Sequence, residues 1–267
     1  MNKIFIIFIL SMIMGQIKEN NDVLKKIQNK TISIDKKKDN FLEKKFAQAK
    51  SLERSGLYEE AFTLIKEINL DHPGINKYFQ SLKNYLKETE SWDTLLVYTQ
   101  DYANTRNHDF QSKLEFLDIY IWMDEENKWQ NICQELTSNR KMNKNSMKSI
   151  IQRLVNNGKY DFAHDLLLEY RQNTGLTDFY SLEMGTFFSM RMAFDQAVRE
   201  YLLFLETNPQ QFQTISDRIM VYPDAPDIIS SITTILMESQ LGIAQFILAD
   251  LQFKQKEYDA GYETLKS

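Results

Sequence analysis

The sequence predicts an all-α fold, an α-solenoid built from stacked antiparallel helix pairs. Three observations point to this fold class. One residue pattern recurs along the chain at a spacing of 34 positions. Apolar side chains recur at helical spacing through most of its length. Only 8 Gly and 4 Pro occur in 267 residues, which is too few for the turns of a sandwich or barrel but suits long helices with short connections.

The recurring pattern is an alanine placed between an aromatic residue and a helix breaker. Ala61, Ala163 and Ala197 each follow an aromatic residue by three positions and precede Pro or Gly by twelve. Ala61 lies 34 positions before Leu95, and Ala163 lies 34 positions before Ala197. This interval is the length of one antiparallel helix pair. The pattern therefore predicts one continuous array of about six helix pairs over residues 41–267.

These blocks resemble the tetratricopeptide repeat, most closely in Phe41–Gly74, in Lys144–Gly175 and in the unit that ends at Pro209. The resemblance implies a right-handed superhelix. Small residues would let the paired helices approach closely, glycines would form turns, an aromatic ring would pack into each helix junction, and prolines would end the units. The residues expected in these packing roles are Ala49, Gly56, Tyr58, Ala61, Pro73, Gly158, Tyr160, Ala163, Gly185, Phe194, Ala197 and Pro209.

Two blocks between residues 76 and 140 depart from the family pattern. The small residues of the close-contact positions are replaced by Lys83 and Leu95 in one block and by Tyr120 and Ile132 in the other. On this alignment the spacing becomes 37 residues and then 31. We therefore expect the repeat length to drift here and the superhelical geometry to be irregular.

After Pro209 the sequence predicts helices over residues 211–222 and 227–240, separated by a loop that contains two prolines. A final unit begins near Leu241 and stops at Ser267, inside what should be its second helix. Solenoids usually end in a polar capping element. We therefore expect the last repeat to be incomplete, with the natural chain continuing past Ser267 or a partner covering this end.

The amino terminus has the layout of a secretory signal peptide. A short positive region ending at Lys3 precedes an apolar run over residues 4–14, and Gly15 offers a small residue for cleavage. This run is too short to cross a bilayer, which takes about 20 residues as a helix. An uncleaved amphipathic anchor is the alternative, because the usual Ala-x-Ala site is absent. We expect residues 1–16 to be a signal peptide, residues 17–40 to be a flexible lysine-rich spacer, and the chain to reach a bacterial periplasm or envelope without an integral membrane span.

Charge and cysteine content exclude two classes of function. The segment 17–40 carries seven lysines and four acidic residues, a net charge of +3, and Lys3 adds one more positive charge. Because the whole chain has a net charge of −5, residues 41–267 have a net charge of −9. An acidic body repels phosphate backbones, so we expect no nucleic-acid partner. Cys133 is the one cysteine, which excludes a disulfide framework and a cysteine zinc cluster. Because Cys133 lies beside Ile132 and Leu136 on a predicted helix, we expect its side chain to be a small buried hydrophobe.

Each candidate catalytic residue in the sequence has a structural interpretation. The three histidines have no zinc-type spacing, and no Gly-rich phosphate loop or nucleophile motif occurs. Acid clusters such as residues 124–126 are expected to support helix starts. The tryptophans are expected in the core, with a ligand platform as the alternative. We therefore predict a non-catalytic chain with no metal site and no cofactor. We expect His72, His108 and His164 to be loop or surface residues and Trp92, Trp122 and Trp129 to be core residues.

In the tetratricopeptide family the first helix of each pair lines the inner groove. The resemblance implies that a protein or peptide segment would meet Lys50, Arg54, Asn84, Lys87, Gln152 and Asn156 there. Solvated polar positions are the alternative interpretation of these residues. Some members of the family clamp a terminal carboxylate with a Lys/Asn/Arg set. Phe46 and Asp118 occupy two of those places, so this activity is not implied.

The sequence therefore favours an exported, tetratricopeptide-like scaffold that mediates protein–protein interaction in the cell envelope. One alternative is the non-catalytic superhelical region of a larger envelope enzyme, such as a cell-wall lyase. Another is an assembly factor for outer-membrane proteins. The identity of the partner is not encoded in any motif of this chain.

Overall fold

The computed structural model describes residues 40–138 and 142–266, and within these ranges every regular element is a helix. The first helix is described over residues 40–54. It is followed by α2 (Tyr58–Asp71), α3 (Asn76–Glu88), α4 (Trp92–Thr105), α5 (Phe110–Trp122), α6 (Glu126–Thr137), α7 (Lys144–Asn156), α8 (Tyr160–Thr174), α9 (Ser181–Met190), α10 (Phe194–Thr207), the 3-10 helix η1 (Pro209–Gln211), α11 (Phe212–Met220), α12 (Pro226–Glu238), α13 (Gly242–Lys254) and α14 (Tyr258–Lys266). The predicted all-α fold class is confirmed.

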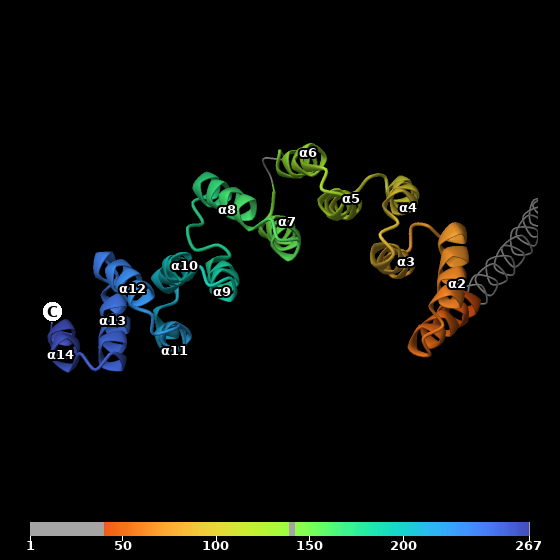
Figure 1. Ribbon diagram of the computed structural model, residues 1–267. Helices are drawn as coiled ribbons and strands as arrows, with labels where there is room; N and C mark the ends of the chain where they lie inside the picture. Colours follow the sequence, from red (N-terminus) through yellow and green to blue (C-terminus); the bar gives the residue numbers. More distant parts are fainter. Residues whose placement is uncertain (1–39, 139–141, 267) are drawn as a thin grey trace, which may run out of the picture. The chain divides into compact units, whose positions relative to one another are not determined.

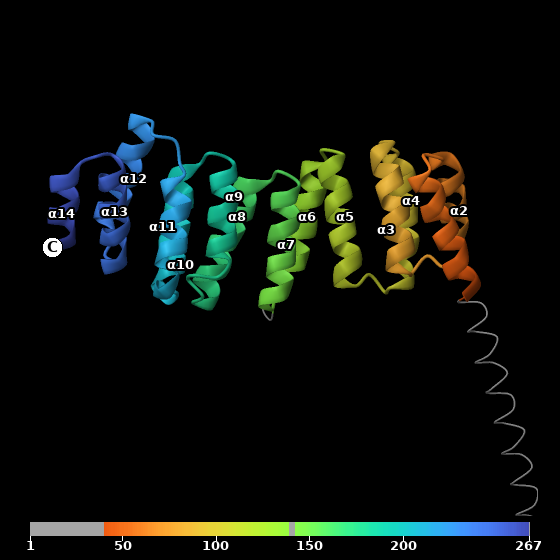
Figure 2. The same cartoon turned by 90° about the horizontal axis from the view of Figure 1, so that it is seen from below.

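Two compact units divide the chain, Met1–Ile119 and Tyr120–Ser267, so that the boundary falls inside α5. In the first unit α3 packs against both α2 and α4. In the second unit α7 packs against α8, α9 against α10, and α13 against α11, α12 and α14. Figures 1 and 2 show that helices adjacent in sequence also lie side by side within each unit. This sequential packing is that of an α-solenoid, as predicted.

The described residues form seven helix pairs rather than the six expected. The additional pair lies after Pro209, where α11 and α12 follow one another in the chain and both pack on α13, and the final unit from Leu241 forms both α13 and α14. The predicted loop with two prolines connects α11 to α12. Residues 1–39 lie outside the described residues. They include the predicted signal peptide and all but the last residue of the predicted spacer. None of the described helices has both the length and the apolar character that crossing a bilayer requires.

The turn inside each of the first five pairs closes with the same backbone hydrogen bond. In the first pair the N–H of Leu57 donates to the carbonyl of Leu52 at 3.0 Å, spanning Gly56 with its left-handed φ of 79°. This bond is the six-residue closure of a Schellman helix end. It recurs at 2.8–2.9 Å from Ser91 to Leu86, from Glu125 to Tyr120, from Lys159 to Leu154 and from Ala193 to Phe188.

This turn recurs at a constant interval along the chain. The prediction that the repeat length drifts between residues 76 and 140 is therefore wrong. The left-handed residues are 56, 90, 124, 158 and 192, each 34 positions after the last. The second helices begin at the same interval. The equivalent of Leu95 is therefore Trp129 rather than Ile132, and the equivalent of Lys83 is Leu117 rather than Tyr120. The turns keep this interval whatever the size of the side chain, and the indole of Trp129, only 2% exposed, is buried where three of the other four repeats have alanine.

The structure places most of the predicted packing residues at helix contacts or turns. Gly56 and Gly158 have left-handed backbones, and Pro209 begins η1. Pro73 lies in the turn after α2. Tyr160 and Phe194 are half-buried. The small residues at close-contact positions are all buried, namely Ala49, Ala61, Ala163, Gly185 and Ala197.

Tyr58 does not pack into the helix junction as predicted, because its side chain is 61% exposed. Tyr160, at the same position of its repeat, is covered from the following turn, where the guanidinium of Arg191 lies 3.9 Å from the ring centroid. The residue equivalent to Arg191 in the repeat after Tyr58 is Thr89, at the same offset of 31 positions. Its short side chain bonds to the carbonyl of Tyr85 instead. The aromatic ring at this position is therefore covered only where the next turn supplies a long side chain.

The closest helix contact generates a stability prediction. A Cβ added at Gly185 would lie 2.7 Å from the ring of Tyr201 and 3.2 Å from the carbonyl oxygen of Ala197. Because Tyr201 is itself fully buried, its ring has no space to move into. We expect Gly185→Ala to lower the free energy of unfolding by about 1–3 kcal/mol, measured by urea denaturation.

Gly242→Ala is the matched control for this substitution. Nothing lies within 4 Å of the corresponding Cβ at the first residue of α13. Alanine should be neutral or slightly stabilising there, because it has the higher helix propensity. Equal losses in the two variants would contradict the tight packing of α9 on α10.

Candidate interaction surface

The 34-residue register aligns two sets of positions on the first helices. One set is residues 50, 84, 118, 152 and 186, and the other, one helical turn later, is residues 54, 88, 122, 156 and 190. We call these ten positions the first-helix face. Five of the six predicted groove residues belong to it, and Lys87 directly precedes residue 88.

The predicted groove residues fall into both units, and each group is described separately. In the first unit Arg54, Asn84 and Lys87 are exposed, while Lys50 is half-buried and pairs with Glu53 at 2.7 Å. In the second unit Gln152 and Asn156 on α7 are exposed. Five of these six side chains are therefore exposed to solvent.

Polar contacts join successive first helices at an offset of about one repeat. In the second unit the indole nitrogen of Trp122 donates to Asn157 at 2.6 Å. Further contacts of this kind follow, at 2.7–2.9 Å, between Lys148 and Glu183, between Arg218 and Thr186, and between Ser216 and Asp250. In the first unit Lys77 pairs with Glu43. Because each contact spans one repeat, it can form only when neighbouring pairs stack in register.

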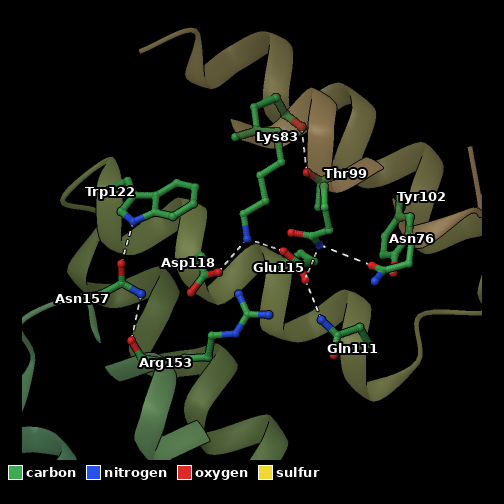
Figure 3. Close-up of polar contacts among 12 residues, drawn as sticks. Asn76, Lys83, Thr99, Tyr102, Gln111, Glu115, Asp118, Trp122, Arg153 and Asn157 are labelled. Atoms are coloured by element: carbon green, nitrogen blue, oxygen red, sulfur yellow. Dashed lines mark hydrogen bonds and ion pairs between the residues drawn. The ribbon is translucent and has the colours of Figure 1, made fainter. Parts of the chain in front are cut away.

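The most deeply buried of these contacts is an ion cluster between α3 and α5 (Figure 3). The side chains of Lys83, Glu115 and Asp118 are 5%, 0% and 4% exposed. The ammonium of Lys83 lies 2.7 Å from a carboxylate oxygen of Asp118 and also pairs with Glu115. Gln80 and Gln111 donate to Glu115 at 3.0 and 2.6 Å. The cluster holds α3 to α5, and both carboxylate oxygens of Glu115 accept from neighbouring donors.

Sequence reasoning interpreted Lys83 only as a bulky residue at a small-residue position and Asp118 only as a departure from the carboxylate-clamp set. A signal for the cluster was nevertheless present. Lys83 is the one charged residue among the five equivalents at this position, and its acidic partners follow 32 and 35 positions later. A charge in a core position with opposite charges one repeat away indicates a buried ion pair.

A second buried ion cluster joins the second helices α8 and α10. The guanidinium of Arg171 donates to both carboxylate oxygens of Glu200, at 2.9 and 2.7 Å. His164 also reaches this carboxylate, with Nε2 3.1 Å from Oε1, and its ring packs edge-on against Phe188. The prediction of a surface histidine is therefore wrong for His164, whose side chain is 21% exposed. Burial acts to raise the pKa of Glu200, but the hydrogen bonds and charges of His164 and Arg171 outweigh it and hold the pKa below its ordinary 4.5.

Two further predictions concern single side chains. Cys133 is buried, as predicted, and burial raises the pKa of its thiol to about 12. Trp129 lies in the core, as predicted, while Trp92 and Trp122 are half-buried. Among the described residues, no group of three His, Cys, Asp or Glu side chains is arranged to hold a metal ion.

Sequence reasoning missed a hollow on the first-helix face of the second unit. The hollow has a volume of about 440 Å³ and lies between α9, the turn that follows it and the end of α11. Thr186 and Met190 line it, and these are the equivalents of Gln152 and Asn156 one repeat later. Extending the 34-residue interval by one step would have found both residues.

No protein-family model matches the chain, and no curated protein matches it. The helical-repeat architecture therefore rests on the packing and on the 34-residue register described above.

The first ion cluster predicts a large response to removal of its cation. Lys83→Met leaves Glu115 and Asp118 buried without the ammonium that both contact, so we expect a loss of about 3–5 kcal/mol in the free energy of unfolding. The triple variant K83M/E115L/D118L should recover most of this loss, because no buried charge of the cluster remains. Lys77→Met removes an exposed pair and should change stability by less than about 1 kcal/mol. Urea denaturation distinguishes these outcomes, and a K83M loss no larger than that of K77M would contradict the buried-cluster account.

The second cluster predicts a pH-dependent contribution from Glu200. Because the pKa of Glu200 is lowered by folding, its contribution is complete above the unfolded-state pKa and is lost as pH falls through the folded-state value. We expect Glu200→Gln to cost about 2 kcal/mol or more at pH 7. The difference from the wild type should shrink below about pH 4.5. Denaturation at a series of pH values measures this, and exposed Glu206→Gln on the same helix should show no such dependence. A difference that widens on acidification would reverse the assignment.

Proposed function

We propose that the chain is a tetratricopeptide-like scaffold that binds a segment of another protein on its first-helix face. The unbroken 34-residue register of the first five turns carries this proposal. Within each unit, a fixed register brings equivalent side chains of successive first helices onto one face. Faces of this kind are the extended binding surfaces of solenoid repeats.

The side chains of this face indicate how a partner would be held. Arg54, Asn84, Gln152 and Asn156 are exposed and offer hydrogen-bond donors and acceptors without a buried reaction site. Such groups suit recognition of an extended or helical protein segment by hydrogen bonding and charge. We infer a non-catalytic role that needs no cofactor, and the net charge of −9 on residues 41–267 argues against a nucleic-acid partner.

We further propose that the protein acts in the cell envelope after export. The support comes from the sequence, in the positive, apolar and small-residue succession of residues 1–16. A single buried cysteine is compatible with an oxidising compartment.

Capture of partners from envelope extracts tests the binding proposal. The bait is the full chain, and the face variant is Asn84→Glu, Gln152→Glu and Asn156→Glu together. The control variant is Asn131→Glu, Gln172→Glu and Asn173→Glu, which makes the same changes at exposed positions of second helices. Because a rim charge disrupts a polar interface, we expect the face variant to recover the wild-type partner at least about tenfold less, with the control unchanged.

Two results would contradict the proposal. Equal recovery by the face and control variants would remove the first-helix face as the binding surface. Absence of any protein enriched over an unrelated helical bait would remove the scaffold role itself. Fractionation of the same cells tests the location, and recovery of the chain from the cytosol with residues 1–16 intact would exclude export.

A further inference from the structure

The hollow on the first-helix face combines an exposed apolar rim with a charged base. Met190, Met192 and Val221 are 76%, 77% and 80% exposed and surround its opening. Large apolar side chains this exposed and this close together are unusual on a protein surface and mark interaction sites. Methionine in particular adapts its shape to varied apolar ligands.

Met192 stands at a position whose backbone does not favour it. It is the left-handed residue of its turn, with φ of 62°. The equivalent positions in the other repeats carry Gly56, Glu90, Asp124 and Gly158, and Lys256 has a left-handed φ of 65° in the turn of the last pair. A long apolar side chain therefore contributes nothing to the turn and is disfavoured by its φ. Strain of this kind, combined with exposure, points to a binding role for the side chain.

Arg218 supplies the charge at the base of the hollow. One guanidinium nitrogen donates to the hydroxyl of Thr186 at 2.8 Å, and the guanidinium carbon lies 5.8 Å from the ring centroid of Tyr201. Within the described part of the chain, no carboxylate pairs with this guanidinium. A guanidinium has five N–H donors, so several remain for a ligand.

The remaining polar groups of the hollow are neutral. Burial raises the pKa of Tyr222, so its phenol stays protonated at physiological pH. Its hydroxyl shares a hydrogen bond with Ser189, which also lies 3.2 Å from the hydroxyl of Tyr201. Arg218 is therefore the only charged residue that lines the hollow.

We propose that this hollow binds a partner residue that carries a carboxylate beside an apolar group, such as an acidic side chain next to an aromatic or aliphatic one. The apolar group would contact Met190, Met192 and Val221, and the carboxylate would pair with Arg218 in the two-pronged geometry that a guanidinium favours. The proposal deepens the proposed function, because Thr186 and Met190 belong to the first-helix face. The site lies on α9–α11.

A fragment pair tests the chemistry without knowledge of the natural partner. The probes are 3-phenylpropanoate and its uncharged amide, added to the full chain labelled at its methionine methyl groups. Nuclear magnetic resonance follows the methyl signals of Met190 and Met192. We expect the carboxylate to bind with a Kd of roughly millimolar order, as befits a fragment, and about fivefold or more tightly than the amide because of its charge-assisted pair with Arg218.

Three variants separate the contributions. Arg218→Gln should reduce carboxylate binding to the level of the amide, because an amide side chain can still bond to Thr186 but carries no charge. Arg199→Gln removes the same charge from an exposed site on α10 and should leave both affinities unchanged. Met192→Gly restores the residue type of Gly56 and Gly158 at this turn, and it should weaken both probes equally.

Two outcomes would overturn the proposal. One is equal binding of the two probes to the wild-type chain, a result that does not depend on whether any variant folds. The other is a carboxylate preference that survives in a folded Arg218→Gln chain. The result is independent of the capture experiment: fragment binding without a captured partner would remove the scaffold role and keep the hollow. A captured partner without fragment binding would keep the scaffold role and remove the hollow as a binding site.

Discussion

The repeated turn between the two helices of a pair is the constraint on which the structure depends. In each of five consecutive turns, one N–H donates to the carbonyl five residues earlier across a left-handed residue. This closure sets where each second helix begins relative to the first helix of its pair, and the turns recur at a constant interval of 34 positions. Once the interval is constant, side chains one repeat apart meet between neighbouring helices. The polar contacts and the first-helix face both follow from that backbone geometry.

The fold class could be predicted because its signals are local. The aromatic, alanine and breaker residues around Ala61, Ala163 and Ala197 mark second helices whatever packs on them. The register between residues 76 and 140 could not be predicted in the same way. Its left-handed turn residues are Glu90 and Asp124 rather than glycine, so the turns left no compositional mark. Alignment of the block around Trp92 with the block around Trp129 then selected Ile132, although the equivalent of Leu95 is Trp129.

The candidate surface was predicted in part, for a related reason. Polar residues such as Asn84 and Gln152 suggest a groove when a family pattern points to first helices. The apolar rim of the hollow resembles ordinary core residues in sequence, and only its exposure in the folded chain distinguishes Met190 and Met192. The buried ion clusters likewise depend on partners about one repeat away. Because well-packed hydrophobic residues often replace a buried ion pair without loss of stability, we expect the clusters to act mainly on which helix faces stack together.

The burial of Cys133 determines the thiol chemistry of the folded chain. A chain with one thiol cannot form an internal disulfide, and a buried thiol with a pKa near 12 is neither accessible nor ionised enough to attack another molecule. Folding of residues 1–267 therefore involves no internal disulfide, whichever compartment the chain occupies. The folded molecule would also be insensitive to changes in the redox potential of its surroundings.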